Sequence, residues 1–160
     1  MAIAKGSTIP DVKLMTMTAD GPRPIGSHEA LGSGKVVLFA VPGAFTPTCS
    51  DQHLPGYLQL ADEIAAKGVA KVACISVNDA FVMGAWGDAL SVGDDVQMLA
   101  DGNGEFTSGM DLEMDGSGFG LGTRSQRYAA ILEDGVVTEL MVEPGPGVSV
   151  SGADSVLEKL

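Results

Sequence analysis

Residues 36–49 read VVLFAVPGAFTPTC, and this stretch decides how the rest of the chain is interpreted. Its first part, Val36–Val41, is continuously apolar and rich in branched side chains, as is typical of a strand buried on both faces of a sheet. The Pro-Gly pair that follows ends the strand. Thr46 can then cap a helix with Pro47 at its first position, where a missing N–H costs nothing. The stretch therefore predicts a buried strand, a short loop and a helix that carries Cys49 in its first turn.

The remaining elements follow from hydrophobic spacing and from turn residues. We expect strands at Val12–Met17, Val36–Val41, Val72–Val77, Val96–Ala100, Tyr128–Leu132 and Val136–Val142, and helices at Ser27–Leu31, 46–68, Ala80–Leu90 and Ala153–Leu160. Pro55 should bend the second helix, and the Asp134-Gly135 pair suits a tight hairpin turn. Alternating strands and helices followed by a hairpin predict an α/β protein with a three-layer, thioredoxin-like fold, in which helices flank a mixed central β-sheet.

Length and charge limit the classes of function. The chain has 160 residues, which fits one domain over residues 1–160. Nine basic against 21 acidic residues give a formal net charge of -12, which disfavours nucleic acid and anionic membrane surfaces as partners. No stretch reaches the roughly 18 apolar residues of a membrane span, and the N-terminal residues lack a hydrophobic signal core. We therefore expect a cytoplasmic protein.

The two cysteines, Cys49 and Cys74, are too few for a disulfide scaffold. The two histidines lie in different segments from one another, so the dense ligand spacing of a metal site is missing. The glycine-rich segment Gly116–Gly122 fits neither a dinucleotide nor a phosphate loop, and we interpret it as a mobile connection. We expect no metal and no other cofactor.

Cys49 is the best candidate for chemistry. A thiol in the first turn of a helix lies beside unpaired N–H groups and the positive end of the helix dipole, and both favour the thiolate. A thiolate can attack the distal oxygen of a hydroperoxide, which produces a sulfenic acid and releases water or an alcohol. Rapid reaction needs hydrogen-bond donors aimed at both oxygens, and the Cys49 N–H, the Thr46 hydroxyl and one guanidinium could supply them. We favour Arg127, which directly precedes a buried strand.

The segment PGAFTPTCS, followed by His-Leu-Pro-Gly at residues 53–56, closely resembles the signature of type-five peroxiredoxins, in their plant and bacterial type-two-like branch. Further resemblance comes from CISVNDAFV at residues 74–82, from Ala-Trp-Gly at 85–87 and from the Arg127-Tyr128 pair, so it spans nearly the whole chain. The resemblance implies a thioredoxin-like homodimer that reduces hydrogen peroxide and alkyl hydroperoxides without metal or haem.

The resemblance also assigns roles to individual residues. It makes Cys49 the peroxidatic cysteine, lets Thr46 bind the peroxide, and has Pro42 shield the sulfur from solvent. Arg127 would hold both the thiolate and the substrate. Residues 148–151 occupy the place where some members carry a resolving cysteine, and none is present here. Recycling by glutathione with glutaredoxin is therefore our first expectation, with thioredoxin as the alternative reductant.

Simpler interpretations remain beside these. Cys74 lies in an apolar strand, so we favour packing for it over the minority hypothesis that it resolves Cys49. His53 fits a helix-surface or interface residue better than a base, because a thiolate needs no proton acceptor. Phe81 and Trp86 suit core or interface positions on one helix. The rival functions are a thiol–disulfide exchanger on the same fold, although no C-x-x-C occurs, and a catalytically silent binding or holdase module.

Overall fold

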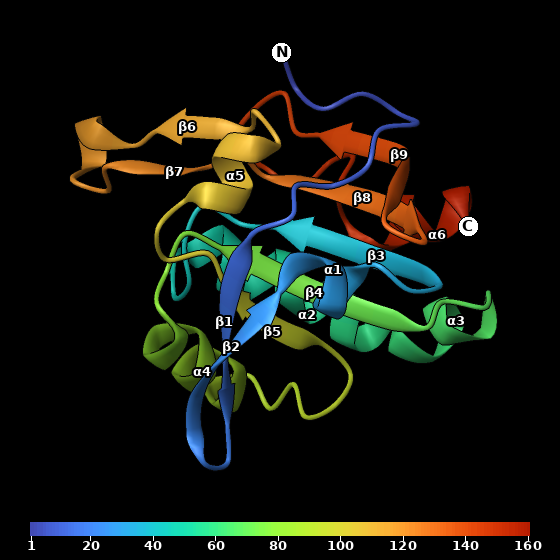
Figure 1. Cartoon of the computed structure of the whole chain (residues 1–160), viewed down its shortest axis with the longest axis horizontal. Coiled ribbons are helices and arrows are strands. Elements are labelled where there is room, and N and C mark those ends of the chain that lie inside the picture. Colours follow the sequence, from blue (N-terminus) through green and yellow to red (C-terminus); the bar gives the residue numbers. More distant parts are fainter.

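The computed structural model describes all 160 residues and contains a seven-stranded sheet in the order β2-β1-β5-β4-β3-β8-β9 (Figure 1). The strands of this sheet are β1 (Lys13–Thr18), β2 (Gly21–Gly26), β3 (Lys35–Ala40), β4 (Lys71–Ser76), β5 (Gln97–Ala100), β8 (Tyr128–Glu133) and β9 (Val136–Val142). A separate two-stranded sheet pairs β6 (Glu113–Asp115) with β7 (Thr123–Ser125). All six strands expected from the sequence are present within one or two residues.

The helical segments are α1 (Ser27–Leu31), α2 (Leu54–Gln59), α3 (Ala61–Ala66), α4 (Ala80–Ala89), α5 (Glu105–Gly109) and α6 (Ala153–Lys159), with a π-helix η1 (Cys49–His53) and a 3-10 turn η2 (Ser117–Phe119). The expected helix over 46–68 is thus divided into η1, α2 and α3. Asp79 caps α4 by accepting a hydrogen bond from the Val82 N–H at 2.8 Å. No helix is both long and apolar enough to cross a membrane.

The sheet separates two apolar clusters and so produces three layers. One face carries Val37 and Phe39 of β3 and packs against α2, α3, α4 and α6, and this cluster includes both cysteines. The other face carries Val36 and Leu38 and packs against α1 and α5. Alternate side chains of one buried strand therefore supply both cores, as expected for a strand covered on both sides. The predicted α/β architecture, a mixed sheet flanked by helices, is confirmed.

Register brings two distant segments to one edge of the sheet. Strand β3 runs parallel to β4 and antiparallel to β8, and Ala40 at the end of β3 pairs with Tyr128 at the start of β8. The loop that leaves β3 toward Cys49 therefore begins beside the residue that follows Arg127. This pairing is the reason why residues 78 positions apart can meet.

Five elements were not expected from the sequence: β2, α5, β6, β7 and η2. Strand β2 contains Pro22 and Pro24, which cannot donate to a ladder, and it forms at the edge of the sheet, where such residues are tolerated. Helix α5 is only five residues long. The other unexpected elements are β6, β7 and the η2 turn between them: the segment Gly116–Gly122, expected as a mobile connection, closes the β6–β7 hairpin, which projects away from the central sheet (Figure 1).

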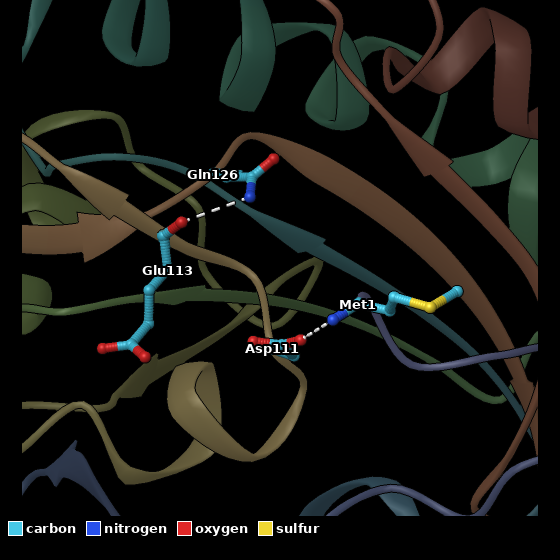
Figure 2. Close-up of polar contacts among 4 residues, drawn as sticks. All are labelled: Met1, Asp111, Glu113 and Gln126. Carbon is cyan, nitrogen blue, oxygen red and sulfur yellow. Dashed lines mark hydrogen bonds and ion pairs between the residues drawn. The ribbon is translucent and has the colours of Figure 1, made fainter.

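The segment that precedes Arg127 is held by the β6–β7 region. Figure 2 shows the side chain of Gln126 donating from Nε2 to the carbonyl of Glu113 at 3.2 Å, and the N-terminal amine of Met1 contacting Asp111 nearby. The backbone N–H of Gln126 also donates to the carbonyl of Leu112 at 2.8 Å. These bonds fix the backbone one residue before Arg127.

Candidate active site

The loop after β3 is tied to the next strand by Asn78. Its Oδ1 accepts hydrogen bonds from the Ala44 N–H at 3.0 Å and from the Ser76 hydroxyl at 2.7 Å. Space in the loop is tight at Gly43, where an added Cβ would lie 3.2 Å from both the Thr46 methyl and the Arg124 guanidinium. Phe45 adopts a positive φ of 64°, which is strained for a bulky side chain. The loop is therefore held in one conformation from several sides.

Thr46 begins the helix, but not in the predicted way. Its carbonyl accepts the Ser50 N–H at 3.0 Å, as an N-cap carbonyl does, and Pro47 takes the first helical position. The hydroxyl, however, donates back to the carbonyl of Gly43 at 2.6 Å and does not cap an N–H of the helix. The expected side-chain cap is therefore wrong. With its proton used in this bond, the Thr46 oxygen presents lone pairs to its surroundings.

The turn that carries Cys49 is a π-helix, in which the Leu54 N–H donates to the Cys49 carbonyl. Pro55 follows at once and occupies the first turn of α2. Proline has no N–H and its ring clashes with a carbonyl four residues earlier, so a regular α-helix through this position would be broken. The widened turn accommodates the proline, and π-turns of this kind often occur at functional sites. The predicted distortion near Pro55 therefore takes the form of the π-helix.

Cys49 and Arg127 meet inside the protein. Arg127 Nη2 donates to Cys49 Sγ at 3.1 Å, while the arginine is 7% exposed and the cysteine has no exposed surface. The indole N–H of Trp86, on α4, donates to the hydroxyl of Ser50 at 3.0 Å and fixes the residue beside the cysteine. The sulfur is therefore closed off from solvent in this conformation. A hydrogen bond from a guanidinium favours a negatively charged sulfur.

Arg127 makes a second short hydrogen bond, with His53. Its Nη1 lies 2.9 Å from Nδ1 of His53, and its carbonyl accepts the Glu143 N–H at 2.9 Å. The guanidinium thus has one nitrogen on the thiol sulfur and another on an imidazole. Of the residues predicted for the site, Cys49 and Arg127 are brought into direct contact.

Comparison with known proteins places this constellation in a family. Residues 4–157 match the redoxin family. Peroxiredoxin-2E-2 of Oryza sativa subsp. japonica, a chloroplastic protein, is 50% identical over 99% of this chain and 72% of its own length, and Peroxiredoxin-2B of Arabidopsis thaliana is 45% identical over 99% and 98%. The structure of reduced Prx3 from Vibrio vulnificus in complex with hydrogen peroxide superimposes with a TM-score of 0.93, at 52% identity over 98% of both chains.

The chain belongs to the peroxiredoxins. The family assignment makes the protein a thiol-dependent peroxidase, as the motif around Cys49 predicts, and its fold is thioredoxin-like. The type-five resemblance agrees with the similarity to peroxiredoxin 5 from Alvinella pompejana, which is 36% identical with a TM-score of 0.85.

His53 corrects the sequence interpretation of this peroxiredoxin. It was expected on the helix surface or at an interface, yet it is completely buried between Phe39, Tyr57 and Arg127. The pKa of His53 is lowered to about 4, chiefly by burial and also by the Arg127 charge, and a hydrogen bond with Ser151 opposes this shift. The histidine is therefore neutral at pH 7. Its position four residues after Cys49 on one helix was the signal in the sequence.

Glu143 was not recognised from the sequence at all. It follows β9, and its carboxylate accepts hydrogen bonds from three consecutive N–H groups, those of residues 149–151, and from the hydroxyls of Ser149 and Ser151. Although partial burial acts to raise the pKa of Glu143, these hydrogen bonds lower it to about 2. The carboxylate thus fixes the Ser151 carbonyl, which accepts bonds from Tyr57 at 2.7 Å and His53 at 3.0 Å.

The remaining candidates lie at the margin of the site. Pro42 is partly buried, and its carbonyl accepts a long bond of 3.4 Å from Arg124 Nη1, whose Nε donates to Leu121 in the β6–β7 hairpin. Cys74 is fully buried in β4, opposite Phe39, and desolvation together with the nearby Cys49 raises its pKa well above the usual range. The burial predicted for Cys74 is confirmed.

Proposed function

We propose that Cys49 is the peroxidatic residue and that it reduces hydrogen peroxide and alkyl hydroperoxides. Its thiolate attacks the distal peroxide oxygen, an S–O bond forms as the O–O bond breaks, and the leaving oxygen departs with the bonding electron pair and takes a proton to become water or an alcohol. The sulfur becomes a sulfenic acid. The observation that carries this proposal is the 3.1 Å bond from Arg127 to the Cys49 sulfur in a buried site.

Arg127 supports both ends of this step. A guanidinium on the sulfur stabilises the thiolate before reaction, and its remaining N–H groups can donate to an oxygen on which negative charge develops. The Cys49 N–H, in the first turn of the helix, is a second donor at the same place. Because these groups are held by the protein, they need little reorganisation during reaction.

Thr46 acts as an acceptor in this proposal. Its hydroxyl proton is committed to Gly43, so its lone pairs can receive the O–H of the peroxide and orient the distal oxygen toward Cys49. From the sequence, we had expected the Thr46 hydroxyl to donate a hydrogen bond to the peroxide. Pro42 remains our candidate for shielding the sulfur, and Cys49 is completely buried in the structure.

A direct assay tests these roles. Hydrogen peroxide consumption is measured with wild type, Cys49→Ser and Arg127→Ala, and the first variant should lose all turnover. Arg127→Ala should slow thiolate oxidation about a hundredfold or more. Full activity in Cys49→Ser would overturn the assignment.

We further propose that an external thiol recycles the sulfenic acid, with glutathione and glutaredoxin preferred over thioredoxin. Support comes from Cys74, whose burial in β4 makes it a poor partner, and from the lack of a cysteine in residues 148–151. Steady-state turnover with each reductant system separates the alternatives. A Cys49–Cys74 disulfide that accumulates after one equivalent of peroxide would instead support resolution within the chain.

For the assembly, we propose one thioredoxin-like domain over residues 1–160 that forms a homodimer. The large exposed apolar side chains include Phe45 in the active-site loop, Phe81 at the start of α4 and Phe119 in the β6–β7 hairpin. Exposed aromatics of this size are typical of protein interfaces. Sedimentation at several concentrations tests the homodimer, and a monomer at every concentration would contradict it.

For the compartment, we propose the cytoplasm, because two free cysteines fit a reducing environment.

A further inference from the structure

Arg124 lies beside the loop that leads from β3 to Cys49, and two carbonyls hold it there. Its Nε donates to the carbonyl of Leu121 at 2.9 Å, and its Nη1 donates to the carbonyl of Pro42 at 3.4 Å. The first bond anchors the side chain to the β6–β7 hairpin, and the second places it against the active-site loop. The guanidinium is therefore fixed between the hairpin and the loop, while the residue remains partly exposed.

The close packing at Gly43 brings this guanidinium near Thr46. A Cβ added at Gly43 would lie 3.2 Å from Arg124 Nη1 and 3.2 Å from the Thr46 methyl, so both groups flank one point of the backbone. Thr46 is the residue to which the proposed function assigns the O–H of the peroxide. A reactant that is bound at Thr46 therefore has the Arg124 guanidinium beside it.

The positive charge of Arg124 has no carboxylate partner, although the chain has 21 acidic and only nine basic residues. The ion pairs of the structure use the N-terminal amine, Lys5 and Arg23 instead. On the neighbouring strand β6, the carboxylate of Asp115 accepts the Ser117 N–H at 2.9 Å within the hairpin. The two bonds to carbonyls occupy Nε and one N–H of Nη1, so both N–H groups of Nη2 and the second N–H of Nη1 are left for a ligand.

The ligand that fits these N–H groups is a carboxylate. Its two oxygens match the pair of N–H groups that Nη1 and Nη2 present side by side, and charge-assisted pairs of this kind are stronger than neutral hydrogen bonds. We propose that Arg124 is a specificity-determining residue that binds the carboxylate of the reactant at Cys49, which rests on the peroxidase function proposed above. The carboxylate belongs either to an organic hydroperoxide or to glutathione, whose glycine carboxylate lies one residue from its thiol.

Both reactions leave the role of Arg124 the same. With a hydroperoxide, the Cys49 thiolate attacks the distal oxygen as described above. With glutathione, the incoming sulfur forms an S–S bond with Cys49 as the S–O bond of the sulfenic acid breaks, and the hydroxide that leaves takes a proton to become water. The thiol is oxidised and the sulfenic acid is reduced. Arg124 takes part in no bond change and holds only the carboxylate end of the reactant.

Paired reactants that differ only in the carboxylate test each source. Linoleic acid hydroperoxide is compared with its methyl ester, both below the concentration at which they form micelles. Glutathione is compared with its ethyl ester at the glycine carboxylate, after Cys49 has been oxidised by one equivalent of hydrogen peroxide. Second-order rate constants are measured by stopped flow, with the fluorescence of Trp86 as reporter, in wild type, Arg124→Gln and Arg23→Gln. The last variant is the matched control, because Arg23 carries the same charge on β2 and pairs with Glu29.

We expect wild type to prefer the acid over the ester roughly fivefold to twentyfold in at least one pair. Arg124→Gln should lose this preference, and Arg23→Gln should retain it. The pair that shows the effect identifies the source of the carboxylate.

Two results would overturn the inference. If Arg124 only anchors the hairpin, Arg124→Gln slows acid and ester equally and the ratio of their rates stays at the wild-type value. Equal rates for acid and ester in wild type, in both pairs, would overturn it even where Arg124→Gln does not fold. Failure of the underlying function is recognised separately, because wild type would then not consume hydrogen peroxide.

Discussion

The buried neutral histidine makes a quantitative prediction about acid stability. Burial lowers the pKa of His53 from 6.5 to about 4, so between these values the unfolded chain binds a proton that the folded protein does not. Stability therefore decreases as the pH falls from 6.5 toward 4. One pKa unit corresponds to about 1.4 kcal/mol, so the loss is about 2 kcal/mol at pH 5 and about 3 kcal/mol at pH 4.

His53→Gln isolates this contribution, because glutamine does not titrate while all other ionisable groups are kept. Arg127, Cys49, Tyr57 and Glu143 are the charged or titratable groups that surround the ring, and they are present in both proteins. We expect the difference in unfolding free energy between wild type and variant to shrink by about 2 kcal/mol between pH 7 and pH 5.

Urea unfolding under reducing conditions, at one protein concentration and several pH values, measures this difference. The same concentration is needed because association would shift the apparent stability of both proteins. A difference that stays constant within about 0.5 kcal/mol from pH 7 to pH 5 would refute the reasoning, since the histidine would then titrate alike in the folded and unfolded states.

Three further predictions concern neighbouring residues. Thr46→Val should slow thiolate oxidation roughly a hundredfold, measured by stopped flow, because the acceptor for the peroxide O–H is lost. Glu143→Gln should lower the unfolding free energy at pH 7 by about 1–2 kcal/mol in urea titrations, since charge-assisted bonds to residues 149–151 become neutral ones. Its lowered pKa of about 2 also means that the stabilisation from Glu143 is present above pH 4.5 and decreases as the pH falls toward 2. Cys74→Ser should turn over peroxide normally with the external reductant, in a coupled peroxidase assay, because Cys74 is packed and not resolving.

The sheet could be predicted from the sequence because its strands carry local signals. Val36–Val41 and Val72–Val77 are uninterrupted apolar runs, and Asp134 and Gly135 both adopt the positive φ that a tight hairpin turn requires. Strand β2 had no such signal. Its two prolines argue against a strand, and only its place at the sheet edge, a property of the folded protein, makes them acceptable.

The residues of the site likewise fall into those that local sequence predicts and those that it does not. Cys49 and Arg127 could be predicted from the sequence because Cys49 follows the end of β3 and Arg127 directly precedes β8. The antiparallel pairing of these two strands brings both segments to one edge of the sheet. The burial of His53 depends on a π-turn and on a carbonyl 98 residues away. Pro55 indicates a distortion at the turn, but nothing in the local sequence indicates the distant carbonyl. Glu143 is likewise defined by three N–H groups of an irregular segment, and backbone donors have no sequence signature.

The geometry also limits how the leaving oxygen can be stabilised. Arg127 can only donate hydrogen bonds, and the one proton of neutral His53 is directed at the Ser151 carbonyl, away from the sulfur. The Thr46 proton is engaged with Gly43. In the proposed reaction, the protein therefore lowers the barrier mainly by holding the positive charge of Arg127 beside the departing oxygen.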